Sequence, residues 1–551
     1  MPASFDTLIR GGRVIDGTGN PWQRADIGIA GGKVSAVGAL TGATARRTID
    51  AANRWIVPGF VDVHTHSDFS LILNPTAESH LGQGITTDVI GNCGFSAFPR
   101  TPNNRRLMLD PEGVDGSWSS TPEYFAALRA ARPGCNVVAL VGHSTIRQAV
   151  LGKAERPATA AELQQMRELV REAMSSGAVG LSTGLDYVPG KFAELTEFVE
   201  LSKVVAEFGG LYVSHVRGLT DTILPAVDEA IAIGERSGVP VQISHMTVFG
   251  RANWGLSEDV IQRIDAARAR GVDVTADVFA YPTAGSSWGP RAVFPEDVSL
   301  YLRPSDEALR SMRTQLQDPK RRAEIRRSVD ERRTMAKKGF YQEMRIFGSW
   351  SEIFVEGVGA GSANAALVGR SVASIAADRK VDPAELYFDL IVEEGEAFSS
   401  VHIQISENDH KAFIEQPWMM FSTDTVTTSP ERAGDPFNVF QAHPGNYATY
   451  PRVLKRLALE RGWLRLEDAV RKCTSFPAQR FGLRDRGFVG VGAAADLVVL
   501  DLDGLTEGAS WLHPHRYPTG IDHVLVNGVS ALSRGRLTGE RAGQALASPA
   551  A

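Results

Sequence analysis

Three features are scarce in this sequence, and each absence excludes a class of protein. Only three of the 551 residues are cysteine (Cys93, Cys135 and Cys473), which is too few for a disulfide framework. No stretch approaches the roughly 18 consecutive apolar residues that a membrane-spanning helix needs. Lysine and arginine number 58 against 64 aspartate and glutamate, so the net charge is -6 and nothing favours binding to nucleic acid or an anionic membrane.

The remaining composition is that of an ordinary globular protein, with 43% hydrophobic and 22% charged residues. The length predicts more than one domain. An odd number of cysteines, together with the lack of an apolar run after a basic start in residues 1–14, favours a reducing cytoplasm. We expect a small-molecule partner only, and the sequence does not indicate an oligomeric state.

The two ends of the chain share one pattern, in which short apolar runs alternate with turns. Residues 26–38 predict a hairpin with Gly31-Gly32 as its turn, and residues 7–17 predict another hairpin. Similar apolar runs return near the other end of the chain. Because neither end segment is expected to fold alone, we predict one β-sandwich domain built from both termini, residues 1–57 and 487–551.

Between these ends, residues 58–486 alternate strand-like runs with helical stretches, which is typical of a parallel sheet. The number of candidate strands, about eight, is the number that a closed (β/α)8 TIM-like barrel requires. An open doubly wound sheet is the alternative, but it gathers its ligands at one switch point, whereas polar residues here follow many strands. An insertion at about residues 289–360 is expected to overhang the barrel mouth as a lid.

The segment that organises the chain is residues 57–66, VPGFVDVHTH, which predict a buried strand ending in two histidines. Asp62, His64 and His66 share one face, because side chains alternate along a strand. A polar face on a buried strand is unfavourable unless something binds it, and a divalent metal would do so. For an isolated His-x-His, two solvated histidines on a turn are the simpler interpretation. The residues that follow the other predicted strands therefore decide whether this is a metal site.

Four more strand-like runs are followed by side chains that can bind a metal or a proton, namely Cys93, His215, His245 and Asp424. Each residue alone is weak evidence, since a buried cysteine often only packs as a small apolar group. Together they indicate one site at one end of the barrel. A thiolate with two imidazoles is a zinc-type set, and these three ligands would leave the fourth position open, as catalytic zinc requires.

The two histidines of the opening strand suggest a second metal position. His64 and His66 could hold that metal, with Cys93 as a bridging ligand. Asp424 would then act as general base and general acid beside the activated water.

On these residues the chain resembles the amidohydrolase superfamily, and within it the N-acyl-D-amino-acid deacylase (D-aminoacylase) family. The motifs that carry the resemblance are residues 57–66, 91–94 (GNCG), 180–185 (GLSTGL), 214–217 (SHVR), 244–245 (SH) and 422–424 (STD). The resemblance implies a tightly held Zn²⁺ on Cys93, His215 and His245 and a weaker second site at His64 and His66. It also implies that a cysteine replaces the carboxylated lysine which bridges two metals in many relatives.

The activity that this resemblance implies is hydrolysis of an exocyclic carbon–nitrogen amide bond by metal-activated water, with Asp424 as the acid-base. Cyclic-amide hydrolases are an alternative, but they usually carry the lysine bridge. Deaminases usually have a histidine and glutamate pair where Val216 and Arg217 follow His215 here. A non-catalytic barrel scaffold would require the loss of ligands, and none is visibly lost.

The substrate pocket departs from the family pattern. Tyr281 and Ser287 match the hydroxyl groups that bind the substrate's α-carboxylate in the family. Thr247 stands where the family has a lysine, Gly445 stands where it has an arginine, and Thr425 replaces a glycine after Asp424. The cations that could substitute are Arg217, Arg291 and Arg432. Without such a cation, the substrate would be a carboxylate-free amide, an aryl amide or a carbamate.

Overall fold

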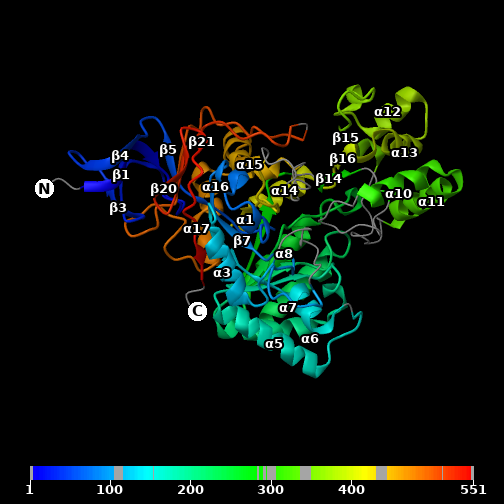
Figure 1. The fold of residues 1–551 in the computed structure, drawn as a ribbon, viewed down its shortest axis with the longest axis horizontal. Helices are drawn as coiled ribbons and strands as arrows, with labels where there is room; N and C mark the ends of the chain where they lie inside the picture. Colours follow the sequence, from blue (N-terminus) through cyan, green and yellow to red (C-terminus); the bar gives the residue numbers. More distant parts are fainter. Residues whose placement is uncertain are drawn as a thin grey trace.

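The computed structural model of the protein describes residues 4–104, 116–152, 154–281, 284–288, 293, 306–335, 349–429, 443–511 and 513–547. Three parts follow one another along the long axis in Figure 1. A β-sheet made from both termini lies at one end, a barrel lies in the middle, and an inserted unit lies at the other end.

The central part is a ring of parallel strands. In order round the ring these are β6 (Phe60–Asp62), β7 (Ile85–Ile90), β8 (Asn136–Ala139) with its continuation β9 (Val141–Gly142), β10 (Gly180–Gly184), β11 (Leu211–His215), β12 (Val241–Ile243), β13 (Val274–Phe279) and β17 (Met419–Ser422). The ring closes where β17 returns to β6, since Thr65 and Thr425 form a parallel bridge. These strands are rich in valine and isoleucine because both of their faces are buried.

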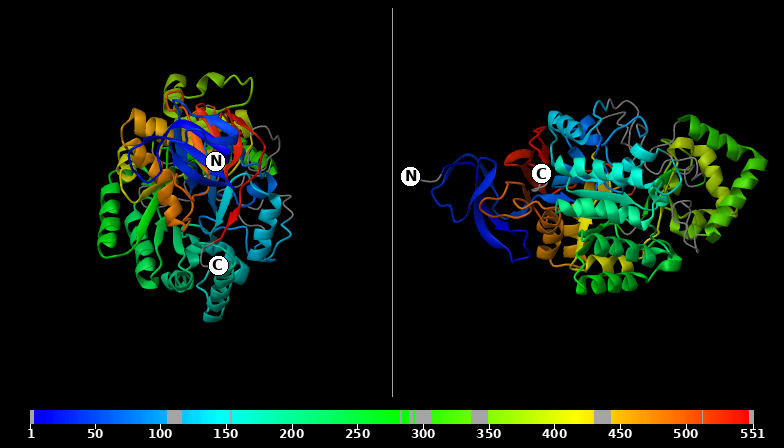
Figure 2. Two further views of the ribbon diagram at one scale, coloured as in Figure 1. Left: turned by 90° about the vertical axis from the view of Figure 1, so that its left-hand side faces the viewer. Right: turned by 90° about the horizontal axis from the view of Figure 1, so that it is seen from below.

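Amphipathic helices connect successive strands and cover the outside of the ring (Figure 2). Four of them are α5 (Ala160–Ser175), α6 (Leu195–Glu207), α7 (Ile223–Ser237) and α8 (Ser257–Ala269). Helix α5 begins with a capping box, in which Thr159 and Glu162 each accept a hydrogen bond from the other's backbone N–H. Its buried face consists of Met166, Val170, Ala173 and Met174. Helix α5 is one of the helical stretches predicted between the strands of residues 58–486.

The remaining described α-helices of the barrel region are α1 (Ser70–Leu73), α2 (Glu78–Leu81), α3 (Thr121–Ala131), α4 (His143–Leu151), α14 (Glu407–Ile414), α15 (Gly445–Arg452), α16 (Leu466–Cys473) and α17 (Ser475–Arg480). A two-residue strand, β22 (Ala545–Leu546), pairs in parallel with β8 on the barrel.

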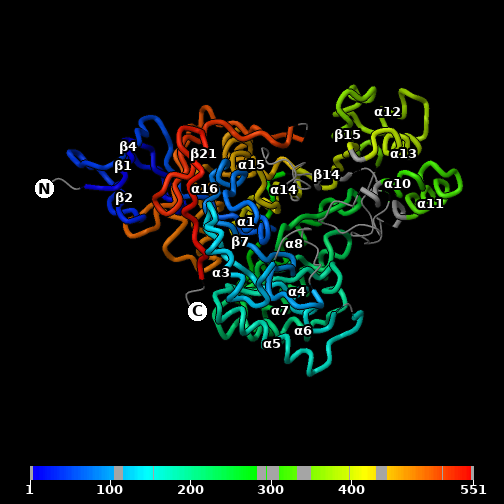
Figure 3. The backbone as a smooth tube through the Cα atoms, viewed as in Figure 1, coloured from blue at the N-terminus to red at the C-terminus, as the bar shows by residue number. Residues whose placement is uncertain are grey.

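The terminal domain is a 9-stranded sheet to which both ends of the chain contribute. Its strands are β1 (Ser4–Val14), β2 (Gln23–Ala30), β3 (Lys33–Gly38), β4 (Thr44–Asp50), β5 (Trp55–Pro58), β18 (Leu497–Leu500), β19 (Ile521–Val526), β20 (Val529–Ser533) and β21 (Arg536–Leu537). Strand β18 pairs with β5, so the sheet joins the two ends, whose blue and red segments lie side by side in Figure 3. Residues from both ends, such as Ile27 and Leu525, share one core.

The inserted unit has its own small sheet and its own core. The sheet runs β14 (Ala284–Trp288), β16 (Ser399–His402), β15 (Ile353–Gly357), and the helices are α10 (Asp306–Gln317), α11 (Pro319–Met335), α12 (Val372–Arg379) and α13 (Pro383–Glu394). Buried residues of this core extend from Val293 to Phe398, beyond the expected end of the insertion at about residue 360. The division of the chain into domains stays a prediction.

The inserted unit is attached to the loop that follows β12. Arg251 forms an ion pair of 2.7 Å with Glu352, and the Gly250 N–H donates to the Gln404 carbonyl at 2.9 Å. Because this loop leaves the carboxyl end of β12, the unit lies on the carboxyl side of the barrel, where a lid would lie. Among the described helices, none has the length and apolar character needed to cross a membrane.

Candidate metal centre

The side chains predicted to bind metal lie together at the carboxyl ends of the barrel strands. His64 and His66 follow β6, Cys93 follows β7, His215 is the last residue of β11, and His245 follows β12. All five are buried, with exposed fractions of 4% or less. Because parallel strands end on the same rim, residues far apart in the sequence meet here.

The sulfur of Cys93 lies between the other ligand atoms. Its Sγ is 3.3 Å from His64 Nε2, 3.5 Å from His245 Nε2 and 3.9 Å from His215 Nδ1. His215 Nδ1 is in turn 2.9 Å from His245 Nε2. The ligand atoms of His64, Cys93 and His245 all lie within 4.8 Å of one another, a span that one ion with bonds of about 2.0–2.3 Å can bridge.

The protonation of these histidines suits metal binding. Burial lowers the pKa of His215 to about 3 and the pKa of His245 to about 4, and it lowers the pKa of His64 as well. The three imidazoles are therefore neutral at pH 7, and the neutral form is the one that binds a metal. A buried thiol among neutral imidazoles is a donor set of the kind that zinc prefers, so the residues fit this ion.

Asp424 follows β17 and is the most exposed member of the group. Its Oδ1 lies 3.4 Å from His64 Nε2 and 3.3 Å from His66 Nε2, and its side chain is 30% exposed. Burial opposes ionisation of this carboxyl, but the imidazoles of His64, His66 and His245 outweigh burial, so its pKa lies below the ordinary value. An ionised carboxylate at this position can accept a proton or bind a second metal with His64 and His66.

Three residues of the centre adopt a backbone conformation that is unusual for residues other than glycine. Cys93, His245 and Asp424 have φ angles of 53°, 34° and 52°. Such conformations cost about 1–3 kcal/mol each and persist where the surroundings hold them. The His245 N–H donates to Asp277 at 3.0 Å, and the Asp424 N–H donates to the His64 carbonyl at 3.0 Å.

Asp277 on β13 is a contributor that the sequence analysis did not identify. Its carboxylate accepts from the His245 N–H and, at 2.8 Å, from Ser422 Oγ, and it lies 3.9 Å from His64 Nδ1. Burial raises the pKa of this carboxyl. One side chain thus contacts three strands that carry the site, as carboxylates behind metal-binding histidines do. The only feature of the sequence that could have identified Asp277 is its position as a charged residue inside an apolar strand.

A second residue outside the predicted set is Asp186, which follows β10. Its Oδ2 lies 3.9 Å from His215 Nε2, on the side of the ring away from Cys93. Burial raises the pKa of this carboxyl to about 7. The signal that could have found it is again an acidic residue shortly after a strand end.

Tyr281, which follows β13, belongs to an aromatic group near the centre. Its ring centroid lies 5.5 Å from that of His443 and 6.2 Å from that of Trp511. The guanidinium carbon of Arg452 lies 4.5 Å from the centroid of the Tyr281 ring. Burial lowers the pKa of His443 to about 4, and the Asp424 carboxylate opposes this effect. His443 and Trp511 were not predicted, because their loops reach the site only through tertiary packing.

The cations considered for binding a carboxylate lie in different surroundings. The guanidinium of Arg217 donates to Glu229 through two bonds of 2.8 and 2.9 Å, and it also donates to backbone carbonyls. Its hydrogen-bonding capacity is therefore largely used within the protein. Arg291 and Arg432 lie outside the described residues.

The other substrate-binding candidates are only partly placed by the fold. Ser287 lies in β14, where its backbone pairs with Ser400, and its side chain is outside the described residues. Thr247 is buried and donates to the His245 carbonyl at 3.3 Å. Gly445 is the first residue of α15. The roles of Tyr281, Ser287 and Arg217 toward a substrate stay predictions.

The fold and the site can now be compared with known proteins. The profile of the amidohydrolase family matches residues 47–310 and 430–531. N-acyl-D-glutamate deacylase from Alcaligenes xylosoxydans xylosoxydans is 36% identical over 96% of this chain and 94% of that enzyme. D-aminoacylase from the same organism is 33% identical over 99% of this chain and 98% of that enzyme. The chain therefore belongs to the amidohydrolase family.

Solved structures agree with this assignment. The crystal structure of N-acyl-D-glutamate deacylase from Bordetella bronchiseptica, in complex with zinc and a phosphonate inhibitor, is 32% identical with a TM-score of 0.76, and covers 99% of this chain and 100% of that one. A crystal structure of D-aminoacylase is also 32% identical with a TM-score of 0.76, and covers 98% of this chain and 100% of that one. The predicted resemblance to deacylases and the predicted fold are confirmed.

Proposed function

We propose that the protein is a zinc-dependent hydrolase that cleaves an exocyclic carbon–nitrogen amide bond in a small molecule. The observation that carries this proposal is the convergence of Cys93, His215 and His245 with Asp424 at one barrel rim. The relatives named N-acyl-D-glutamate deacylase and D-aminoacylase support the reaction class. The small and odd number of cysteines also supports a cytoplasmic location as part of the proposal.

The residues that would hold the tight zinc are Cys93, His215 and His245, and His64 and His66 would form a second, weaker position. When bound, zinc supplies a Lewis acid that lowers the pKa of water and polarises the scissile carbonyl. Asp424 takes the proton from the attacking water and then delivers it to the leaving amine, which is a poor leaving group without protonation.

The residues expected beside the substrate's α-carboxylate differ from the family pattern in this chain. The resemblance placed a lysine and an arginine near the α-carboxylate, and Thr247 and Gly445 occupy these positions. Arg217, the described candidate to replace them, is bound to Glu229. Charge-assisted bonds contribute roughly 1.5–3 kcal/mol each, so their loss disfavours a carboxylate. We therefore propose a carboxylate-free amide, aryl amide or carbamate as the second candidate substrate class.

Metal analysis and a substrate panel test both parts of the proposal. Purified protein should contain about one zinc per chain or more and should hydrolyse compounds from a panel of N-acyl-D-amino acids and neutral anilides. Turnover of the neutral compounds only would assign the second class, and turnover of the acids would assign the first. Protein without zinc and without turnover of either series would support a scaffold instead.

A further inference from the structure

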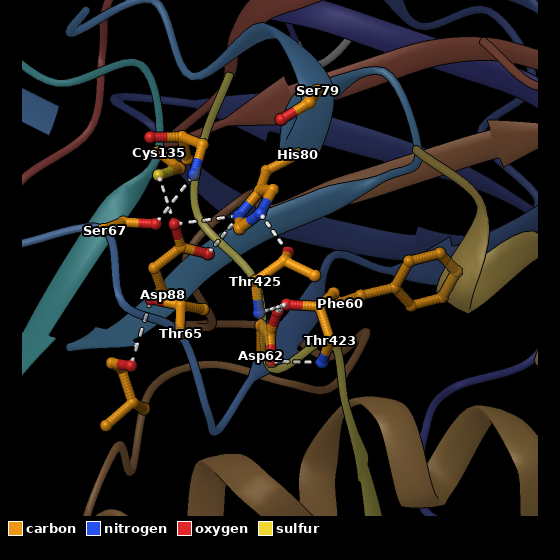
Figure 4. A network of polar contacts seen from close by, with 12 residues as sticks. Phe60, Asp62, Thr65, Ser67, Ser79, His80, Asp88, Cys135, Thr423 and Thr425 are labelled. Carbon is orange, nitrogen blue, oxygen red and sulfur yellow. Dashed lines mark hydrogen bonds and ion pairs between the residues drawn. The ribbon is translucent and has the colours of Figure 1, made fainter. Parts of the chain in front are cut away.

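A buried hydrogen-bond network surrounds the two residues that flank Asp424 (Figure 4). On one side, Asp62 of β6 accepts from Thr423. Thr423 Oγ1 donates to one carboxylate oxygen at 2.6 Å, and the Thr423 N–H donates to the other at 3.1 Å. The same Asp62 accepts from the His64 N–H at 3.2 Å. One carboxylate thus ties the ends of β6 and β17 together, immediately before a metal ligand and the acid-base.

On the other side, Thr425 is linked to a buried histidine. Thr425 Oγ1 lies 3.5 Å from His80 Nε2, and His80 Nδ1 lies 3.0 Å from both oxygens of Asp88. The carbonyl of Thr425 accepts from the His66 N–H at 2.8 Å. His80 and Asp88 have exposed fractions of 1% or less, so this pair is screened from water.

These contacts matter because they hold the backbone on both sides of Asp424. Its φ of 52° is a conformation that a residue with a side chain leaves readily unless its neighbours are held. Its own N–H donates to the His64 carbonyl at 3.0 Å. Its flanking residues add further restraints, Thr423 through Asp62, and Thr425 through His80 and through its backbone bond to the His66 N–H.

We propose that Asp62 and the His80–Asp88 pair are positioning residues, which hold Thr423 and Thr425 and thereby fix the Asp424 carboxylate beside His64 and His66. This inference rests on the proposed function, because it assigns the network to the reaction of that site. The ligand atoms of Asp62, His80 and Asp88 lie within 4.8 Å of one another, and we assign the group to hydrogen bonding within the protein. Both oxygens of Asp62 and both oxygens of Asp88 already accept bonds from protein donors.

The first test removes single hydroxyl groups from the network. Thr423→Val keeps the side-chain shape and the backbone bond to Asp62 but loses the hydroxyl, which donates to Asp62 and accepts from the Thr425 N–H, and Thr423→Ser keeps the hydroxyl. Thr425→Val and Thr425→Ser make the same comparison on the side of His80. Thr474→Val is the matched control, because the buried Thr474 hydroxyl donates to the Val470 carbonyl at 2.6 Å, the same length as the Thr423 bond.

The measurements are kcat, KM, zinc per chain and the melting temperature, on whichever amide the wild-type protein hydrolyses. Loss of such an outer-shell contact typically lowers activity about 10- to 100-fold. We expect Thr423→Val to lower kcat by this factor, with KM and zinc content unchanged, and Thr423→Ser to restore kcat. Thr425→Val should lower kcat by a smaller factor, because its bond is longer. Thr474→Val should lower the melting temperature without lowering kcat.

Three kinetic outcomes overturn the inference. The first is a wild-type kcat in folded Thr423→Val protein. The others are a kcat in Thr423→Ser, or in the Thr474→Val control, that falls as far as in Thr423→Val. A crystal structure of Thr423→Val gives a readout apart from activity, and it should show the Asp424 carboxylate displaced from His64 and His66. An unmoved carboxylate would also overturn the inference. If the wild-type protein hydrolyses no amide, the proposed function fails, and the crystal structure alone then decides whether Asp62 fixes Asp424.

Discussion

At the scale of single residues, Asp424 differs from the histidines of the metal centre by its access to solvent. Its side chain is 30% exposed, whereas those of His64 and His66 are 0% and 1% exposed. It is also ionised, because its pKa lies below the ordinary value. A group that exchanges protons with water and substrate needs access to solvent, whereas a ligand that only holds a metal does not.

The substitution Asp424→Asn should therefore separate catalysis from metal binding. We expect kcat to fall by about 10²–10⁴, the range for removal of a general acid-base, while zinc per chain stays unchanged. Steady-state kinetics and elemental analysis of the same preparation measure the two quantities. Asp409→Asn is the control, because Asp409 is a buried carboxylate that binds Gly255 and Ser257 instead of the centre. Near-normal turnover in Asp424→Asn would show that the acid-base is another residue.

His410 provides a pH prediction that is independent of metal. Burial lowers its pKa to about 4, from an ordinary value of 6.5, and its Nε2 donates to the Phe279 carbonyl at 2.8 Å. Above pH 6.5 the residue is neutral in both the folded and the unfolded protein. As the pH falls from 6.5 toward 4, only the unfolded chain takes up a proton, so the free energy of unfolding decreases.

Urea unfolding of wild type and His410→Gln measures this effect, since other groups titrate equally in both proteins. Glutamine keeps a donor for the carbonyl but does not titrate. The variant should be less stable at pH 7 by about 1 kcal/mol. Between pH 6.5 and 4 the wild type should lose up to about 3 kcal/mol relative to the variant. A stability difference that is constant with pH would contradict the assignment.

The convergence of the proposed ligands could be predicted from the sequence because each follows an apolar, strand-like run. The residues around them could not be predicted in this way. Asp277 lies inside the strand Val274–Phe279, and a single charged residue there carries no information about which neighbours it binds. Trp511 comes from a loop near the C-terminal part of the sheet, so its proximity to Tyr281 depends on packing between parts of the chain.

At the scale of elements, glycine pairs in the sequence predicted one hairpin turn correctly. The same pattern failed where a glycine allows close packing against another strand. The hairpin at Gly31-Gly32 is confirmed, because β2 and β3 are antiparallel and both glycines have positive φ. The hairpin predicted for residues 7–17 is wrong, since β1 continues through Gly11 and Gly12. The register with β2 shifts there, and a Cβ on Gly12 would lie 2.4 Å from Ile56 Cδ1. The glycines therefore form a bulge.

The turn after β7 gives a prediction for an element that positions a ligand. Gly91 has a φ of 80°, and a Cβ added there would lie 2.1 Å from the Leu140 carbonyl oxygen. Because that oxygen belongs to the barrel wall, Gly91→Ala should displace the turn that carries Cys93. We expect reduced zinc per chain and a lower free energy of unfolding.

Gly271→Ala is the matched control for this turn, because Gly271 has a φ of 94° but nothing lies within 4 Å of an added Cβ. This variant suffers only the backbone penalty, about 1–2 kcal/mol. Elemental analysis and urea unfolding of both variants distinguish the two effects. Full zinc content in folded Gly91→Ala protein would show that the turn does not control the position of Cys93.

At the scale of the whole molecule, the barrel brings together ligands from four different strand ends, and the other two parts lie at either side of it. The terminal sheet depends on both ends of the chain, since β18 pairs with β5. The inserted unit is attached to the loop after His245 through Arg251 and Glu352. The sequence predicted this order because the pattern of apolar runs changes at each boundary. The separate core of the insertion could not be predicted, because its residues are too far apart in the sequence to form a local pattern.

This arrangement predicts that zinc stabilises the folded barrel as a cross-link. Cys93, His215 and His245 come from separate strands. Only in the folded chain do His215 Nδ1 and His245 Nε2 lie within 3.9 Å of the Cys93 sulfur. A ligand that binds only the folded state adds about 2.7 kcal/mol at 100 times its Kd. Chelation should therefore lower the melting temperature, and restoring zinc should reverse the change.

Calorimetry of wild type, Cys93→Ala and Cys473→Ala, each with and without chelator, tests this cross-link. Cys473 is a buried free thiol outside the centre, so its variant should respond to chelator as the wild type does. Cys93→Ala should contain little zinc, and its melting temperature should not depend on the chelator. A wild-type melting temperature that is the same in both conditions would mean that no metal joins these strands, and a chelator response retained in Cys93→Ala would place the metal on other ligands.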